Sequence, residues 1–236
     1  MTRKILVIDV GGTNVKLHVT GHGETIKFPS GKKLTPGRIL RGALAAVAAK
    51  GWKFDAITVG IPAPIKRGKA VLEPANLGRG WTRFDWRKAR KPLRLVNDAA
   101  MQALGSYKGG KLLFLGLGTG LGSALVVEGI VEPMELGHLP YRKATYEDYV
   151  GVRGLKRVGK KKWRRYVEDV VTRLVAALEP DDVVLGGGNV HKLRKLPPGC
   201  RAGENANAFR GGFLLWKAAR DLGRPARGRS RRSVDR

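Results

Sequence analysis

Cysteine is almost absent from this chain of 236 residues, which contains only Cys200. A single thiol cannot form an internal disulfide, and it cannot supply the cysteine cluster of a zinc site. Long hydrophobic runs are also missing, because no segment approaches the roughly 20 apolar residues that a membrane-spanning helix needs. The apolar run at 5–10 is too short for a secretion signal. We therefore expect a cytoplasmic globular protein that does not associate with membranes.

Negative charge is scarce as well. The chain has 19 acidic residues against 46 lysines and arginines, a formal net charge of +27. Such a field attracts polyanions, but it does not distinguish nucleic acid, polyphosphate, anionic lipid and nucleotides. Much of the excess lies in 156–165 and in 224–236. The second segment is predicted to be a disordered basic tail, and both are equally consistent with solvated surface.

The first strong pattern is an apolar strand at 5–10 that meets a glycine bend and resumes as a strand. Glycines let backbone N–H groups approach a ligand without a Cβ in the way, which suits a phosphate. A nearby hydroxyl and amine would add to such a site, and the carboxylate that ends the strand could hold Mg²⁺ through water. These candidates are Asp9, Gly11, Gly12, Thr13 and Lys16.

The same layout returns at 112–129, where two apolar strands flank a second glycine-rich bend. Repetition of a strand-bend-strand unit predicts two similar lobes. We place the first lobe at 1–108 and the second at 109–208, with a helix at about 209–223 packing back on the first. The candidate phosphate-binding residues of the second bend are Gly118, Thr119, Gly120 and Gly122.

Between these bends the pattern is mixed α/β. Helical spacing of apolar residues predicts helices at 37–51, 145–159, 161–180 and 207–223. Short apolar runs predict strands near 55–65, 93–97 and 181–186, and the last of these meets three glycines.

Asn97 and Asp98 stand where a predicted strand runs into a helix. A hydroxyl that attacks phosphorus needs a carboxylate to accept its proton and a neighbouring group to fix its orientation. The pair therefore forms the candidate catalytic centre. Simple helix capping explains the same two residues equally well.

Two further polar segments are candidates for binding a sugar. Glu135 and His138 are three residues apart, and a carboxylate with an imidazole suits vicinal hydroxyls. The alternative is a surface glutamate and a satisfied histidine. Asn76 and Trp81 lie in a polar loop, where an Asx-turn and a core aromatic are the alternative.

Taken in order, these motifs resemble the ROK family of sugar kinases, within the actin and hexokinase-like superfamily. The stretch 117–139 and the late segment 201–216 are similar to the polyphosphate glucokinase branch of that family. The resemblance covers nearly the whole chain to about Trp216. It is carried by "IDVGGTNVK", "VGIPAPI", "VNDAAMQA", "LGTGLGSALVVEGIVEPMELGHL" and "LGGGNVHK".

The resemblance implies an α/β fold of two RNase H-like lobes with a central cleft. It also implies phosphoryl transfer to the 6-hydroxyl of glucose or a related hexose, with Asp98 as general base. Polyphosphate, ATP or both would be the donor, Mg²⁺ the cofactor, and a homodimer the assembly. Sugar hydroxyls would be held by Asn76, Asn97, Asp98, Glu135 and His138. The phosphates would be bound by the residues of both bends together with Gly186, Gly187 and Gly188.

Departures from the family pattern shape these expectations. The cysteine-rich zinc motif that many members carry after the Glu-x-Gly-His segment is missing, so we expect no structural zinc. The chain is shorter in this region, which leaves Glu147 as a candidate for a further sugar-binding acid. No helix-turn-helix domain precedes the first bend, so nucleic acid is not expected as the main partner. The alternatives are a non-catalytic sugar-sensing or polyanion-binding protein, and a kinase for mannose or an N-acetylated hexosamine.

Overall fold

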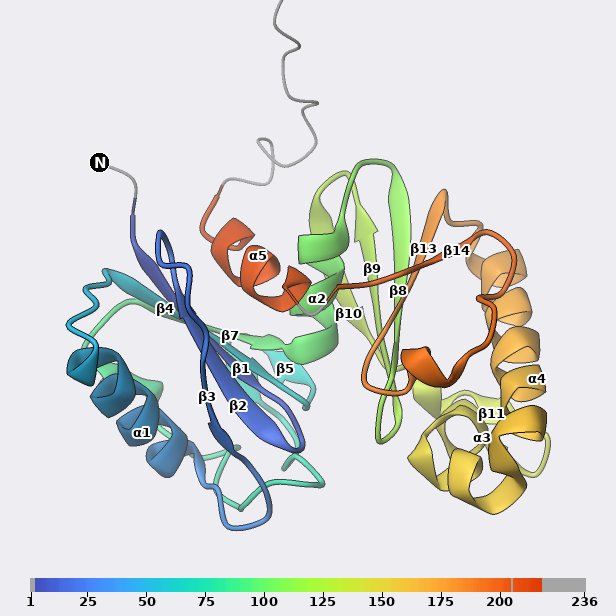
Figure 1. Cartoon of the computed structure of the whole chain (residues 1–236), viewed down its shortest axis with the longest axis horizontal. Coiled ribbons are helices and arrows are strands. Elements are labelled where there is room, and N and C mark those ends of the chain that lie inside the picture. Colours follow the sequence, from blue (N-terminus) through green and yellow to red (C-terminus); the bar gives the residue numbers. More distant parts are fainter. Residues whose placement is uncertain (1–2, 205, 218–236) are drawn as a thin grey trace, which may run out of the picture.

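The structure is a computed structural model that describes residues 3–204 and 206–217. It contains two five-stranded sheets, with helices on their outer faces and between them (Figure 1). The chain is therefore a mixed α/β protein, as the sequence predicts. No helix in the described part of the chain has the length and hydrophobicity to cross a membrane.

The first sheet has the strand order β3-β2-β1-β4-β7. β1, β2 and β3 pair antiparallel, whereas β1, β4 and β7 pair parallel. The strands are β1 (Ile5–Val10), β2 (Asn14–Val19), β3 (Ile26–Pro29), β4 (Ala56–Ile61) and β7 (Leu93–Asn97).

The second sheet has the order β10-β9-β8-β13-β14. Its first three strands along the chain pair antiparallel, and β8, β13 and β14 pair parallel. The strands are β8 (Lys111–Leu117), β9 (Leu121–Val127), β10 (Ile130–Met134), β13 (Asp182–Gly186) and β14 (Cys200–Ala202).

The two sheets thus share one topology. In each, the third, second, first, fourth and fifth strands along the chain lie side by side, with the same parallel and antiparallel pairings. Each glycine bend joins the first strand of its sheet to the second. The internal repeat in the sequence therefore corresponds to a structural repeat.

Two long helices cover the outer faces of the sheets. α1 (Pro36–Ala49) packs on the first sheet and α4 (Val152–Leu178) on the second (Figure 1). α1 begins with the Thr35 side chain capping it and Pro36 in its first turn, as helix N-termini favour. α3 (Tyr146–Val150) precedes α4 directly.

The remaining two helices lie between the sheets. α2 (Asp98–Ser106) continues directly from β7, and α5 (Asn207–Leu214) packs closely against it (Figure 1). The close approach depends on glycine, because a Cβ at Gly105 would overlap the backbone of Asn207, and one at Gly211 would overlap that of Met101. α5 also holds the first sheet, since the buried Thr58 hydroxyl donates a hydrogen bond to Gly212 O (2.8 Å).

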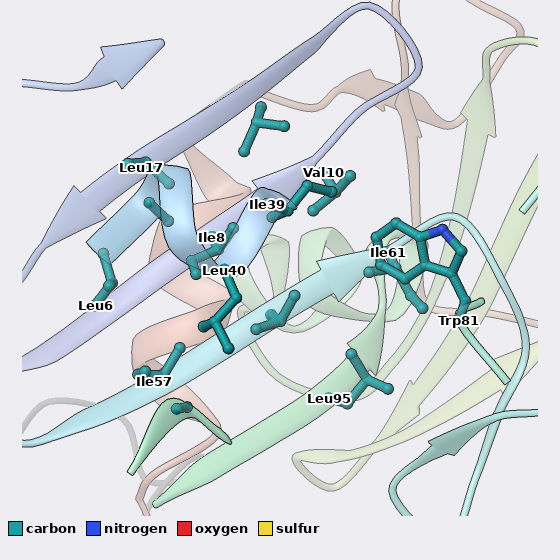
Figure 2. Packing of buried hydrophobic residues seen from close by; sticks show 14 of the residues in the cluster. Leu6, Ile8, Val10, Leu17, Ile39, Leu40, Ile57, Ile61, Trp81 and Leu95 are labelled. Carbon is teal, nitrogen blue, oxygen red and sulfur yellow. The ribbon is translucent and has the colours of Figure 1, made fainter. Parts of the chain in front are cut away.

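The core is built by strands that bury both faces. On β1, the side chains of Leu6 and Ile8 join those of α1 and β4, as Figure 2 shows, whereas Ile5 and Val7 join the cluster around α2 and α5. A strand buried on both sides reads as a continuous hydrophobic run, which is how 5–10 reads. A third cluster fills the space between the second sheet and α3 and α4.

Short elements complete the chain: β5 (Ile65–Lys66), β6 (Lys69–Ala70), β11 (Pro140–Tyr141), β12 (Ala144–Thr145), and the 3₁₀ turns Trp86–Ala89, Leu136–His138 and Val190–Lys192.

Two predicted helices differ from the structure. The sequence predicts helices at 145–159 and 161–180, whereas in the structure the break between the two helices is at Gly151. Near the predicted break, Gly159 has a left-handed backbone (φ 73°) that interrupts α4. The final helix ends at Leu214, so its predicted extent over 215–217 is wrong. There the Trp216 indole turns back to donate to Thr58 Oγ1 (2.8 Å). The rest of that helix and the predicted tail at 224–236 lie outside the described residues.

Candidate active site

Asp9 and Asp98 are brought together by the parallel strands of the first sheet. In the strand register Asp9 lies opposite Gly60 of β4, which in turn lies opposite Val96 of β7. Asp98 follows two residues later at the first position of α2. A Cβ at Gly60 would overlap the Met101 side chain and lie 3.7 Å from Asp98 Cα, so α2 packs directly on the middle strand. Ligand sites of open α/β sheets form at this carboxyl edge.

The surroundings of Asp98 make it a strong base. Burial of its carboxyl group, together with the nearby carboxylates of Asp9 and Glu135, raises the pKa of Asp98 to about 7, although the N–H of Ala99 lowers it. That N–H donates to Asp98 Oδ1 at 2.8 Å. A carboxyl with a pKa near neutrality is suited to accept and release a proton at physiological pH.

Asn97 caps α2. Its Oδ1 accepts hydrogen bonds from the N–H groups of Ala99 (2.9 Å) and Ala100 (3.1 Å), and its Nδ2 donates to Ala63 O (3.3 Å). The capping interpretation of the sequence therefore describes this residue. Nδ2 has one hydrogen bond within the described residues, and an amide NH₂ can donate two, so the other N–H is available to a ligand.

The first glycine bend is held by a residue that the sequence analysis did not single out. The Ser30 hydroxyl donates to Gly11 O (2.6 Å), and the Ser30 N–H donates to Thr13 O (3.0 Å). Beside the bend, Lys16 Nζ lies 3.9 Å from the buried carboxylate of Asp9. Burial raises the pKa of Asp9, and Lys16 lowers it.

The second glycine bend approaches the first. A Cβ placed on Gly12 would lie only 4.0 Å from Thr119 Oγ1. A Cβ on Gly122 would lie 3.1 Å from that of Ala99, the residue that follows Asp98. Both candidate phosphate-binding bends therefore meet at the start of α2, beside the candidate base.

The glycine run at 186–188 lies against the second bend. Gly187 has a left-handed backbone (φ 85°), and a Cβ there would lie 2.6 Å from Leu117 O. Asn189, which directly follows the run, is buried and donates through Nδ2 to Gly118 O (3.0 Å). The sequence analysis missed Asn189, although its amide stands immediately after three glycines.

Glu135, His138 and Glu147 form a second polar group near this bend. His138 Nε2 lies 4.0 Å from Glu147 Oε1, and Arg153 lies 3.8 Å from the same oxygen. Burial raises the pKa of Glu135, Glu147 raises it further, and His138 opposes them. A Cβ at Gly120 would overlap the carboxylate of Glu147, so the second bend lies against this group.

Of the two candidate residues in the loop at 73–82, Trp81 is buried in the core and Asn76 is partly exposed. Trp81 is 1% exposed, packs near Ile61 (Figure 2) and donates to Gly78 O (2.7 Å). It is a core aromatic, which was the alternative to a ligand-binding role. Asn76 is partly exposed, and no hydrogen bond within the described residues ties its side chain to Asp98.

The acidic residues of the site do not form a metal cluster, but one carboxylate is placed where it could bind Mg²⁺ together with phosphates. Within residues 3–204 and 206–217 no three His, Cys, Asp or Glu side chains gather as a metal cluster. Mg²⁺ does not need such a cage, because it keeps several waters and binds one or two carboxylates together with substrate phosphates. Asp9, beside the first bend, fits that role.

The sequence has relatives among curated proteins, although no family model matches it. It is 28% identical to the polyphosphate glucokinase of Mycobacterium tuberculosis over 217 residues, which cover 81% of this chain and 80% of the relative. It is 26% identical to the polyphosphate glucokinase of Mycobacterium leprae over 213 residues, which cover 81% of this chain and 65% of the relative.

Solved structures share the fold. The inorganic polyphosphate/ATP-glucomannokinase of Arthrobacter sp. strain KM superposes with a TM-score of 0.75 at 22% identity, over 90% of this chain and 98% of the other. The ROK hexokinase of Thermus thermophilus gives 0.70 at 22% identity, over 90% and 97%. The ROK glucokinase of Streptomyces griseus, solved with glucose and AMPPNP, gives 0.70 at 17% identity, over 93% and 99%.

The relatives support the class of a phosphotransferase that acts on a sugar, and the fold is the one that the solved ROK sugar kinases share. Within that class, its similarity in sequence is to the polyphosphate glucokinases.

Proposed function

We propose that the protein transfers the terminal phosphoryl group of polyphosphate or ATP to the 6-hydroxyl of glucose, with Asp98 as the general base. The proposal rests above all on one observation: Asp98, with a pKa of about 7, stands where two glycine bends from separate sheets meet. The names of the relatives support glucose as acceptor and polyphosphate as donor.

In this mechanism Asp98 accepts the proton of the sugar hydroxyl as its oxygen attacks the terminal phosphorus. Asn97 fixes the start of α2 and thereby the position of the base. Backbone N–H groups within the two bends would bind the phosphate oxygens, apart from those of Gly11 and Gly118, which donate to Asn14 O and Gly120 O. Positioning and charge stabilisation of this kind supply most of the rate acceleration in phosphoryl transfer.

Asp9 would hold Mg²⁺ through water, and Lys16 would contribute a fixed positive charge beside the first bend. When bound, Mg²⁺ neutralises negative charge on the donor phosphates. Glycines 186–188 would border the donor next to the second bend, with Asn189 holding that bend in place.

On the acceptor side, Glu135 and His138 would bind sugar hydroxyls, with Glu147 beside His138. Asn76 belongs to the same proposal, through its place in the 73–82 loop. That loop lies near the first bend, because Gly78 N–H donates to Leu34 O (3.1 Å) and Ser30, four residues before Leu34, holds the bend.

A coupled assay of sugar 6-phosphate formation tests the proposal. Glucose, mannose, N-acetylmannosamine and N-acetylglucosamine are each offered with ATP or with polyphosphate. We expect the highest kcat/KM for glucose with polyphosphate. A higher kcat/KM for an N-acetylated hexosamine than for glucose would contradict glucose as the acceptor. Turnover with ATP but not with polyphosphate would contradict polyphosphate as the preferred donor.

A further inference from the structure

We propose that a basic hollow on α4 is an accessory binding site for long polyphosphate chains, separate from the site of phosphoryl transfer. This proposal rests on the proposed function, because polyphosphate is the donor considered there. The hollow has a volume of about 670 Å³ and is lined by Arg142, Val158, Lys161, Lys162, Arg165, Tyr166 and Asp169.

The lining is strongly cationic. Four of its seven side chains are lysine or arginine, and the one carboxylate, Asp169, is already engaged. Asp169 accepts a hydrogen bond from the Tyr141 hydroxyl (2.5 Å) and pairs with Arg173 Nε (3.1 Å). Lys161, Lys162 and Arg165 are not neutralised by it. An extended chain of phosphates is the ligand chemistry that such a surface attracts.

Arg142 reaches the hollow from another element and is held in a costly conformation. It lies in the turn between β11 and β12 with a left-handed backbone (φ 56°), which a residue with a Cβ adopts at an energetic cost. Its guanidinium covers the rings of Tyr141 (5.3 Å to the centroid) and Tyr166 (5.1 Å). The arrangement fixes a positive charge opposite those of α4.

The aromatic side chains favour inorganic polyphosphate over nucleic acid. Proteins that bind single strands stack bases on exposed aromatic faces. Here Tyr141, Tyr149 and Tyr166 pack edge-to-face against one another, and arginine or lysine side chains cover their faces. The hollow thus presents cations to a ligand, while the faces of its tyrosine rings are covered by basic side chains.

α4 connects the hollow to the second glycine bend. The Val152 N–H in its first turn donates to Gly118 O and Thr119 O (both 3.1 Å). Lys161 lies nine residues further along the chain, just past the interruption of α4 at Gly159. Lys192 strengthens the connection, because its Nζ donates to Asn189 Oδ1 (2.6 Å) and its carbonyl accepts from Arg164 of α4 (2.7 Å). The bend and the hollow thus lie at two places along the same helix, so a long phosphate chain with its end at the bends would be the donor that also contacts the hollow.

The test compares donors of different length in matched charge variants. The hollow variant combines Lys161→Gln, Lys162→Gln and Arg165→Gln. The control variant combines Lys53→Gln, Lys88→Gln and Lys91→Gln and removes the same amount of charge. These three lysines are exposed and precede strands β4 and β7 of the first sheet. Arg142→Gly is a third variant, because glycine suits the left-handed backbone there while the side chain is lost.

In the hollow variant we expect the KM for long-chain sodium polyphosphate to rise on the order of tenfold, with the KM values for tripolyphosphate, ATP and glucose unchanged. Direct binding of long-chain polyphosphate should weaken in parallel. Affinity decreases as salt increases, and the slope of log affinity against log salt should become shallower by about 2 when three phosphate contacts are lost. Arg142→Gly should weaken long-chain binding while its thermal unfolding temperature stays at or above that of the wild type.

Unchanged binding and KM for the long chain in the hollow variant, or an equal loss in the control, would overturn the accessory site. Tighter binding of single-stranded DNA than of polyphosphate, lost in the hollow variant, would overturn it in favour of nucleic acid. A wild-type protein that binds long-chain polyphosphate at the hollow without turning it over would instead contradict the proposed donor, because direct binding is measured independently of catalysis.

Discussion

The carboxylate of Asp9, near the end of β1, lies close enough to that of Asp98, at the start of α2, for its charge to add to burial in raising the pKa of Asp98. Like charges this close resist simultaneous ionisation, which helps to keep the pKa of Asp98 near 7. The same edge of the sheet receives both glycine bends. Strand pairing thus determines where Asp98 lies, and burial together with the charge of Asp9 raises its pKa.

The pH dependence of catalysis should reflect this pair. Because Asp98 must be ionised to accept a proton, kcat/KM is expected to rise with pH through about 7. Asp9→Asn removes a like charge and should lower the pKa of Asp98, so the midpoint of the profile should move to lower pH even though the maximal rate falls. Profiles of kcat/KM against pH for both proteins measure the shift. An unmoved or raised midpoint would show that Asp9 does not act on Asp98.

Replacement of Asp98 by asparagine should separate catalysis from stability. Loss of the general base is expected to lower kcat by about 10² to 10⁴-fold, while glucose binding survives. The fold should gain stability at neutral pH. The pKa of Asp98 is about 7 in the folded protein, against an ordinary value of 3.8. As pH rises between these values, the unfolded chain releases this proton while the folded protein keeps it, which favours unfolding of the wild type.

Wild-type stability should therefore fall across that window and level off above pH 7, and the advantage of Asp98→Asn should vanish near pH 4. Thermal unfolding at several pH values measures this difference, with Glu132→Gln, an exposed change on β10, as control. Near-normal turnover of Asp98→Asn would remove Asp98 from the role of base.

The fold could be predicted from local patterns to a large extent. The apolar runs at 5–10 and 112–117 are strands buried on both faces, and the repeated bend gives two sheets of one topology. The end of the last helix could not be predicted, because it depends on a tertiary hydrogen bond from Trp216 to Thr58, far away in the sequence.

The candidate site was predicted less completely. Residues on the bends and Asp98 follow from glycine and strand-end patterns, whereas Ser30 and Asn189 act by holding bends from other segments, which no local pattern indicates. Trp81 and Asn97 had two interpretations each. Burial of the Trp81 indole and the hydrogen bonds of Asn97 support the structural one.

The space between the bends should be sensitive to a single methyl group. Gly12→Ala leaves the fold unstrained, because Gly12 does not have a left-handed backbone and the new Cβ would lie 4.0 Å from Thr119 Oγ1. The methyl group would nevertheless occupy the space that we propose for the donor phosphates. We expect the donor KM to rise on the order of tenfold, which corresponds to about 1.4 kcal/mol. Gly23→Ala, in open space, is the control. Equal donor KM values for both variants would contradict convergence of the bends on the donor.

Glu147 should act on the acceptor side of the reaction. Its carboxylate lies 4.0 Å from His138 Nε2 and 3.8 Å from Arg153, and it contacts the second bend at Gly120. Glu147→Gln keeps the shape of the side chain but removes the charge that positions His138. We expect the KM for glucose to rise on the order of tenfold, about 1.4 kcal/mol, with the donor KM unchanged. Glu132→Gln again serves as the matched control. A change confined to the donor KM would place Glu147, through Arg153, with the phosphates instead of the sugar.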